Sequence, residues 1–185
     1  MSERLSRRQF FSLNLEATVG FLGNFFVPQL ELDREFFRPP GTSSELDFLT
    51  TCNRCGLCKD SCPENIIKLF SLSQGARLAN SPYIDPNESP CTFCKKCIDI
   101  CPTGALHEQA SNRIGYAKIN IPNCIAYKEV MCAYCVDACP QSDAIYLQNG
   151  KPMINKEKCS GCGLCVSSCI TDTKGIYVVP STTHA

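Results

Sequence analysis

The cysteines constrain this chain more than any other residue type, because all 16 of them fall into four blocks of four. The first block, CNRCGLCKDSCP at 52–63, has the spacing C-x₂-C-x₂-C-x₃-C and is followed directly by proline. The second block, CTFCKKCIDICP at 91–102, repeats that spacing. Self-similarity at a fixed period indicates a repeated structural module.

The other two blocks depart from the pattern at one point each. In the third block seven residues, IAYKEVM, separate Cys124 from the next cysteine, and Pro140 ends the block. Counting back from Pro140 therefore leaves Cys124 to take the first position across a widened loop. In the fourth block, CSGCGLCVSSC at 159–169, Ile170 stands where the proline is expected.

Several kinds of site use cysteines at such a density. Disulfide frameworks also take an even number, but they do not require one spacing four times. Zinc Cys₄ sites usually combine two distant C-x₂-C pairs, and c-type haem is excluded because the chain contains no C-x₂-C-H. The run C-x₂-C-x₂-C-x₃-C-P is typical of [4Fe–4S] proteins, in which the fourth cysteine binds the other cluster of a pair. The blocks therefore predict four [4Fe–4S] clusters.

This exchange of fourth cysteines predicts four ligand sets, two in each pair of blocks. The sets are Cys52, Cys55, Cys58 and Cys101 (site 1); Cys91, Cys94, Cys97 and Cys62 (site 2); Cys124, Cys132, Cys135 and Cys169 (site 3); and Cys159, Cys162, Cys165 and Cys139 (site 4). Gly56, Gly161 and Gly163 stand between ligands, where backbone must approach sulfur closely. Lys95 and Lys96 are expected to raise the reduction potential of the adjacent cluster; the alternative is that they are solvated loop charges.

Short extended phrases precede the later blocks, namely SPYID, YAKINIP and KPMIN. They predict short strands around the cysteine loops, with brief helical turns after the proline. The predicted fold class is α+β, with two tandem bacterial-ferredoxin-like 2[4Fe–4S] modules at 46–112 and 113–180. Residues 1–45, with three Phe–Phe pairs, form an arm that either docks a partner or packs on the protein's own core.

Composition excludes several other functions. The 18 Lys and Arg balance 18 Asp and Glu, so neither nucleic acid nor an anionic membrane is predicted as a partner. No apolar run approaches the roughly 18–20 residues that span a bilayer, so no integral membrane span is predicted. His107 and His184 have no ligand spacing to any block. No catalytic residue is predicted, and the chain is expected to be an electron carrier rather than an enzyme.

The N-terminal phrase SRRQFF at 6–11 is close to the twin-arginine export signature. An export signal would suit a protein that folds around its clusters before it crosses a membrane. Against it, Glu16 lies in the following segment and no A-x-A cleavage site precedes the proline-rich stretch. A cytoplasmic binding arm explains the same residues.

Four phrases, FFRPPG, LDFLTTCNRCGLCKDSCPENII, CIAYKEVMCAYCVDACP and KCSGCGLCVSSC, resemble the NapF-type polyferredoxins of periplasmic nitrate reductase operons. The resemblance runs over nearly the whole chain. It implies a cytoplasmic accessory protein with four [4Fe–4S] clusters, in a family where the SRR motif does not imply export. The implied partner is the molybdenum-containing catalytic subunit of nitrate reductase, served by electron transfer or redox-linked maturation.

Two alternatives remain beside this interpretation. The chain is also similar to the NapG/MauM-type ferredoxins, which are exported to the periplasm and form an electron relay with a quinol dehydrogenase. A third hypothesis is a structural iron–sulfur protein whose clusters never turn over.

Overall fold

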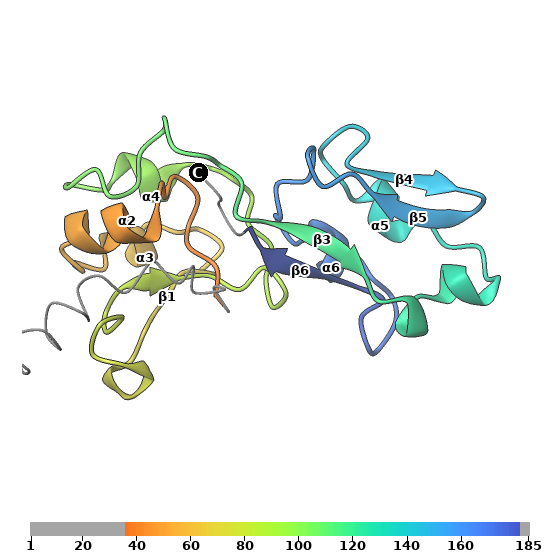
Figure 1. Ribbon diagram of the computed structural model, residues 1–185, viewed down its shortest axis with the longest axis horizontal. Helices are drawn as coiled ribbons and strands as arrows, with labels where there is room; N and C mark the ends of the chain where they lie inside the picture. The colour runs from red at the N-terminus through yellow and green to blue at the C-terminus, as the bar shows by residue number, and fades with distance from the viewer. Residues whose placement is uncertain (1–35, 182–185) are drawn as a thin grey trace, which may run out of the picture. The chain divides into compact units, whose positions relative to one another are not determined.

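A computed structural model describes residues 36–181 of the chain. The phrase SRRQFF, most of the predicted arm and His184 lie outside the described residues. The elements that carry blocks one and two are α2 (Glu45–Thr51), α3 (Leu57–Asp60), β1 (Lys68–Leu69), η1 (Leu72–Gln74), β2 (Pro82–Tyr83) and α4 (Lys96–Asp99). Those that carry blocks three and four are β3 (Gly115–Ile119), η2 (Ile121–Asn123), η3 (Ile125–Lys128), α5 (Tyr134–Asp137), β4 (Ile145–Gln148), β5 (Lys151–Ile154), α6 (Leu164–Ser167) and β6 (Ile176–Pro180) (Figure 1).

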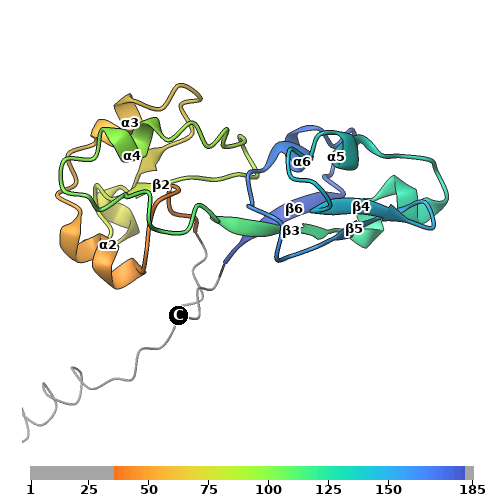
Figure 2. The ribbon, with the colours of Figure 1, turned by 90° about the horizontal axis from the view of Figure 1, so that it is seen from above.

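The second module is framed by two antiparallel strand pairs. β3 before block three pairs with β6 after block four, from Gly115 opposite Pro180 to Ile119 opposite Ile176. β4 and β5 form a hairpin between the two blocks. Its turn is Asn149–Gly150, and both residues have positive φ, 51° and 77°, as this tight hairpin turn requires. Figure 2 shows the two pairs together with α5 and α6.

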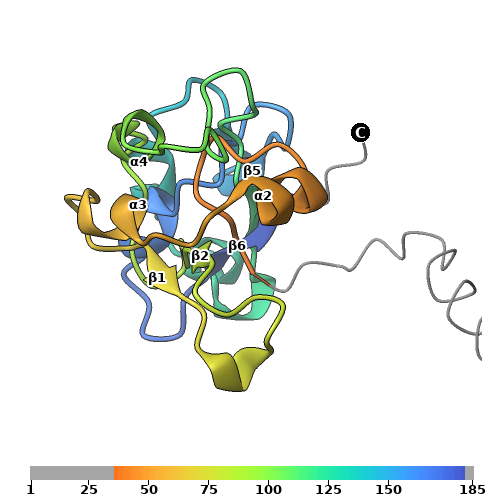
Figure 3. The same ribbon diagram turned by 90° about the vertical axis from the view of Figure 1, so that its left-hand side faces the viewer.

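The first module has less sheet and an added helix. β1 and β2 pair over two residues each, and a single bridge joins Phe37 to Ile84. The helix α2 leads into block one (Figure 3). The side chain of Ser44 caps it by accepting a hydrogen bond from Asp47 N–H, and Phe48 fixes the helix to the core with 1% exposure. Because Cys52 is the C-cap residue directly after α2, the helix positions the first cysteine of site 1.

Residues 37–41 are buried in the core of the first module. Phe37 and Arg38 are 6% and 4% exposed, and Phe37 O accepts from Ile84 N–H at 3.0 Å. Arg38 donates to Ser81 Oγ and to the Pro82 carbonyl. Of the two alternatives for the arm, the structure therefore shows packing on the protein's own core for this part of it. The docking hypothesis concerns residues 1–35, which lie outside the described part.

The predicted strands before the later blocks are confirmed, since β2 and β5 lie in SPYID and KPMIN and β3 runs from Gly115 into YAKINIP. The prediction that helical turns follow the proline is wrong. The turns α3, α4, α5 and α6 each contain the third cysteine of a block and so precede the fourth. In the first three blocks the proline explains this order, because a residue directly before proline is disfavoured in helical conformation. Within each module the turns lie in contact, α3 with α4 and α5 with α6 (Figure 2).

Candidate iron–sulfur sites

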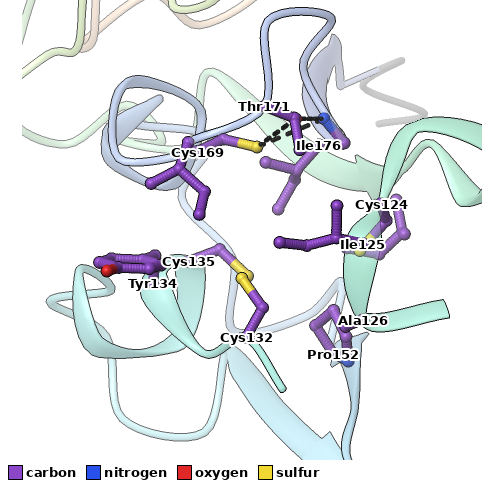
Figure 4. A pocket seen from close by; sticks show the side chains of 13 residues that line it. Cys124, Ile125, Ala126, Cys132, Tyr134, Cys135, Pro152, Cys169, Thr171 and Ile176 are labelled. Carbon is purple, nitrogen blue, oxygen red and sulfur yellow. Dashed lines mark hydrogen bonds between the residues drawn. The ribbon is translucent and has the colours of Figure 1, made fainter. Parts of the chain in front are cut away.

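Site 3 is a cavity whose wall contains all four cysteines predicted for it (Figure 4). Cys124 reaches it from the junction of η2 and η3, Cys135 from α5, and Cys169 from the loop after α6. The widened loop of block three therefore does not displace its first cysteine from the others. The rest of the wall is mainly apolar and includes Ile119 and Ile176.

Sites 2 and 4 are built in the same way. The wall of one cavity contains Cys62, Cys91, Cys94 and Cys97. The wall of another contains Cys139, Cys159, Cys162 and Cys165. In each case three cysteines come from one block and one from its partner block, which is the grouping that the spacing predicts.

Site 1 shows the same grouping through its electrostatics. Burial, together with smaller contributions from the neighbouring thiols of Cys52, Cys55 and Cys101, raises the pKa of the Cys58 thiol to about 11. The first two neighbours come from block one and the third from block two. Cys55 is exposed to solvent, so site 1 lies near the surface.

Most cavity thiols are buried in apolar surroundings that disfavour a bare thiolate. Burial is the main cause that raises the pKa of Cys97 to about 12 and the pKa values of Cys91 and Cys135 to about 11. Burial also raises the pKa of Cys165. These thiols would bind as thiolates only opposite a compensating cation. Four thiols around an apolar cavity are the donor set of a [4Fe–4S] cluster, so the residues present fit that group.

The pKa values of the fourth cysteines of blocks two and four, Cys101 and Cys169, are lowered rather than raised. Burial alone would raise the pKa of Cys101, but hydrogen bonds from the Leu106 and Thr103 backbone and the Thr103 hydroxyl outweigh it and lower the pKa. The pKa of Cys169 is lowered in the same way, against burial, by hydrogen bonds from Thr171 and Gly175. Gly175 N–H donates to Cys169 Sγ at 3.3 Å. Such donors favour a sulfur that carries negative charge, as a cluster ligand does.

These sulfur donors are functional residues that the sequence reasoning missed. Thr103 and Thr171 each stand two residues after a fourth cysteine, and that repeated threonine is the signal that could have revealed them. In block four Thr171 also explains how Cys169 is oriented without the proline: its hydroxyl lies 3.1 Å from Cys169 Sγ and accepts from Gly175 N–H.

The second cysteine of a block lies between two residues in left-handed conformation. In block one these are Arg54 and Gly56, and in block four Gly161 and Gly163. Block two reaches the same conformation without glycine, through Phe93 and Lys95 at φ 53° and 63°, a conformation uncommon for bulky residues. Block three is the exception, since Ala133 has φ −131°. The glycines singled out in the sequence therefore mark a conformation that three other residues, Arg54, Phe93 and Lys95, also adopt.

Lys95 and Lys96, the lysines singled out in the sequence, lie within block two, and His107 follows that block. Lys95 forms an exposed ion pair with Glu108 at 2.9 Å, and Lys96 begins α4 directly before Cys97. His107 is half-buried and its backbone N–H donates to Gly41 O at 2.9 Å. Within residues 36–181, no three His, Cys, Asp or Glu side chains converge closely enough to hold a single metal ion. None of the helices in this part of the chain is long and apolar enough to span a bilayer.

Comparisons with known proteins agree with two pairs of [4Fe–4S] sites in this chain. Residues 51–105 and residues 130–170 each match a family described as a 4Fe-4S dicluster domain. The chain is 34% identical to the methylamine utilization ferredoxin-type protein MauM of Methylobacillus flagellatus, over 96% of this chain and 85% of that protein. It is 33% identical to the ferredoxin-type protein NapG of Escherichia coli, over 77% and 70% of the two chains. It is also 33% identical to the ferredoxin-type protein NapF of the same organism, over 71% and 79%.

Two dicluster domains in tandem are thus confirmed, while the exact boundary between 112 and 113 stays a prediction. The resemblance to NapF is confirmed at the level of the family, although MauM and NapG align over more of the chain. The chain belongs to the family of ferredoxin-type 4Fe-4S electron-transfer proteins that includes MauM, NapG and NapF.

Proposed function

We propose that this protein carries single electrons between redox proteins through four [4Fe–4S] clusters, held by the cysteines of sites 1 to 4. The observation that carries the proposal is that three cavities are each lined by four cysteines drawn from two sequence blocks. Each cluster would supply one-electron chemistry. The protein's own residues would hold it, direct backbone N–H groups at its sulfur ligands and limit its contact with water.

The relatives favour a relay as the context for this electron transfer. The names of the two relatives aligned over most of the chain refer to methylamine utilization and to the Nap series. We therefore favour a NapG/MauM-type relay, coupled to a quinol dehydrogenase, over the role predicted from the resemblance to NapF. Electrons would enter from one redox partner and leave to another, with no substrate chemistry on this chain.

The second candidate is redox-linked maturation of the molybdenum-containing catalytic subunit of nitrate reductase. The 33% identity to NapF over 71% of the chain favours it. The two candidates differ in compartment, because the relay type is exported and the NapF type is cytoplasmic. The cytoplasmic location stays a prediction, and fractionation of cells that produce the full chain would separate the two.

The cofactor proposal is tested on protein purified without oxygen. We expect about 16 Fe and about 16 acid-labile sulfide per chain, and electron paramagnetic resonance (EPR) signals of reduced [4Fe–4S] clusters after addition of dithionite. About 8 Fe per chain would mean that one module carries no clusters, and zinc in place of iron would overturn the proposal. A structural protein whose clusters never turn over would hold the iron but fail to exchange electrons with any low-potential redox protein.

A further inference from the structure

The Asn87 side chain joins the two modules by hydrogen bonding to the backbone of β6 as a neighbouring strand would. The Asn87 carboxamide lies against β6, where its Oδ1 accepts from Val178 N–H at 2.7 Å and its Nδ2 donates to Val178 O at 3.1 Å. This reciprocal pair is the pattern that a neighbouring backbone strand would make. Asn87 comes from the loop before block two, whereas Val178 follows block four, so the contact connects the modules.

A backbone hydrogen bond between two cysteine loops continues this joint. Cys91 N–H donates to Cys162 O at 2.7 Å. Cys91 belongs to site 2 and Cys162 to site 4. One hydrogen bond between ligand residues therefore connects a cavity of the first module to a cavity of the second.

A glycine allows the loops to come this close. A Cβ atom on Gly163 of the second module would lie 2.1 Å from the carbonyl oxygen of Pro86 in the first. At Gly56, which occupies the position of Gly163 in block one, a Cβ atom would meet only Leu69 at 3.7 Å. The tight packing is thus a property of the joint rather than of every cysteine loop.

The joint also changes the exposure of site 4. The second cysteines of blocks one and two, Cys55 and Cys94, are exposed, and Cys132 in block three is half-buried. Cys162, the second cysteine of block four, is 9% exposed, in the loop that the first module contacts. Site 4 therefore exposes fewer of its ligands than sites 1 and 2.

We infer that this joint is an electron conduit, and that the four sites form one chain in the order 1, 2, 4, 3. The inference rests on the proposed function. Within each module, adjacent sites share a block. Cys58 on α3 and Cys62, two residues after that turn, belong to sites 1 and 2, as Cys135 on α5 and Cys139 after it belong to sites 3 and 4. With clusters bound, the residues of the joint would let one electron pass from a reduced cluster in site 2, which would thereby be oxidised, to an oxidised cluster in site 4, which would be reduced, with no bond made or broken. A low-potential one-electron donor protein supplies the electron and a one-electron acceptor protein removes it at the other end.

The test compares two asparagine variants of the full, iron-loaded chain. Asn87→Ala removes the two hydrogen bonds across the joint. Asn155→Ala is the matched control: Asn155 stands four residues before Cys159, as Asn87 stands before Cys91. Its side chain accepts from Glu157 N–H and Lys158 N–H inside the second module. Hydrogen exchange of the Cys91 amide reports on the joint, and we expect roughly 10- to 100-fold faster exchange in Asn87→Ala and no change in Asn155→Ala.

The electronic readout is the EPR spectrum of the fully reduced protein. We expect the wild-type spectrum to require magnetic interaction between sites 2 and 4 as well as within each module. We expect Asn87→Ala alone to weaken that interaction, and laser-flash reduction to show slower redistribution of an electron between the modules. A wild-type spectrum that equals two independent pairs would overturn the conduit. So would redistribution at the wild-type rate in a variant whose Cys91 amide exchanges faster. A chain that binds no iron would instead refute the proposed function.

Discussion

The Arg38 guanidinium donates two hydrogen bonds to the Glu45 carboxylate, from Nε to Oε2 at 3.0 Å and from Nη2 to Oε1 at 2.5 Å. Arg38 is 4% exposed, and its charge lies over the rings of Phe36, Phe48 and Phe70 at 4.7–5.6 Å. It therefore ties the segment before block one to α2 and to the loop at Ser81.

We predict that Arg38→Lys destabilises the protein by roughly 1–3 kcal/mol, because an ammonium group cannot make the planar two-pronged contact. The measurement is the guanidinium chloride midpoint of the iron-loaded protein, without oxygen, followed by circular dichroism. Lys158→Gln, which breaks the exposed ion pair to Asp143, is the control and should leave the midpoint unchanged. Equal midpoints for the wild type and Arg38→Lys would contradict the role given to Arg38.

The cysteines that line the three cavities match those that the spacing of the blocks predicts, because each block is a local loop that brings three sulfurs together. The binding of iron by these sets stays a prediction. The helical turns were predicted in the wrong place, because the short turn that holds the third cysteine ends before the fourth cysteine and its proline. The left-handed conformations of Phe93 and Lys95 could not be predicted either, because they are uncommon for these residue types. The joint could not be derived either. Asn87 and Val178 are 91 residues apart, and nothing in the spacing of the blocks connects them.

Equivalent glycines should respond differently to the same substitution. Gly56 and Gly163 have φ of 80° and 85°, so alanine at either position carries a similar left-handed strain of roughly 1–2 kcal/mol. Only Gly163→Ala also clashes with the Pro86 carbonyl. We predict a lower unfolding midpoint and faster cluster loss for Gly163→Ala than for Gly56→Ala, measured by bleaching of the visible absorption. Identical behaviour would show that the modules do not pack tightly at this point.

The two lysines of block two should affect the reduction potential of site 2 unequally. Lys95 is paired with Glu108, and their hydrogen bond is the first cause that raises the pKa of Lys95. Lys96 forms no ion pair within residues 36–181. We predict that Lys96→Gln lowers the potential by tens of millivolts and that Lys95→Gln lowers it less, because the uncompensated charge better stabilises the reduced cluster. An EPR-monitored redox titration measures this, and unchanged potentials in both variants would identify both lysines as solvated loop charges.

Removal of iron should unfold much of the chain. Buried cysteines such as Cys97, Cys135 and Cys165 belong to the hydrophobic core. In the proposed iron-loaded state, the clusters would fill the space that these side chains surround. We predict that complete chelation abolishes the near-UV circular dichroism of the tyrosines, and that iron and sulfide restore it. A native-like spectrum without iron would show that the fold is independent of its clusters.

Paired cysteine substitutions test the exchange of fourth cysteines most directly, with iron per chain as the measured quantity. Cys55 and Cys101 lie in different blocks but are assigned to one site, whereas Cys94 and Cys101 share a block and are assigned to two sites. We predict that Cys101→Ala retains about 12 Fe of the full 16, that Cys55→Ala with Cys101→Ala also retains about 12, and that Cys94→Ala with Cys101→Ala retains about 8. The reverse order of the two double variants would show that each block binds its own cluster, and would contradict the account.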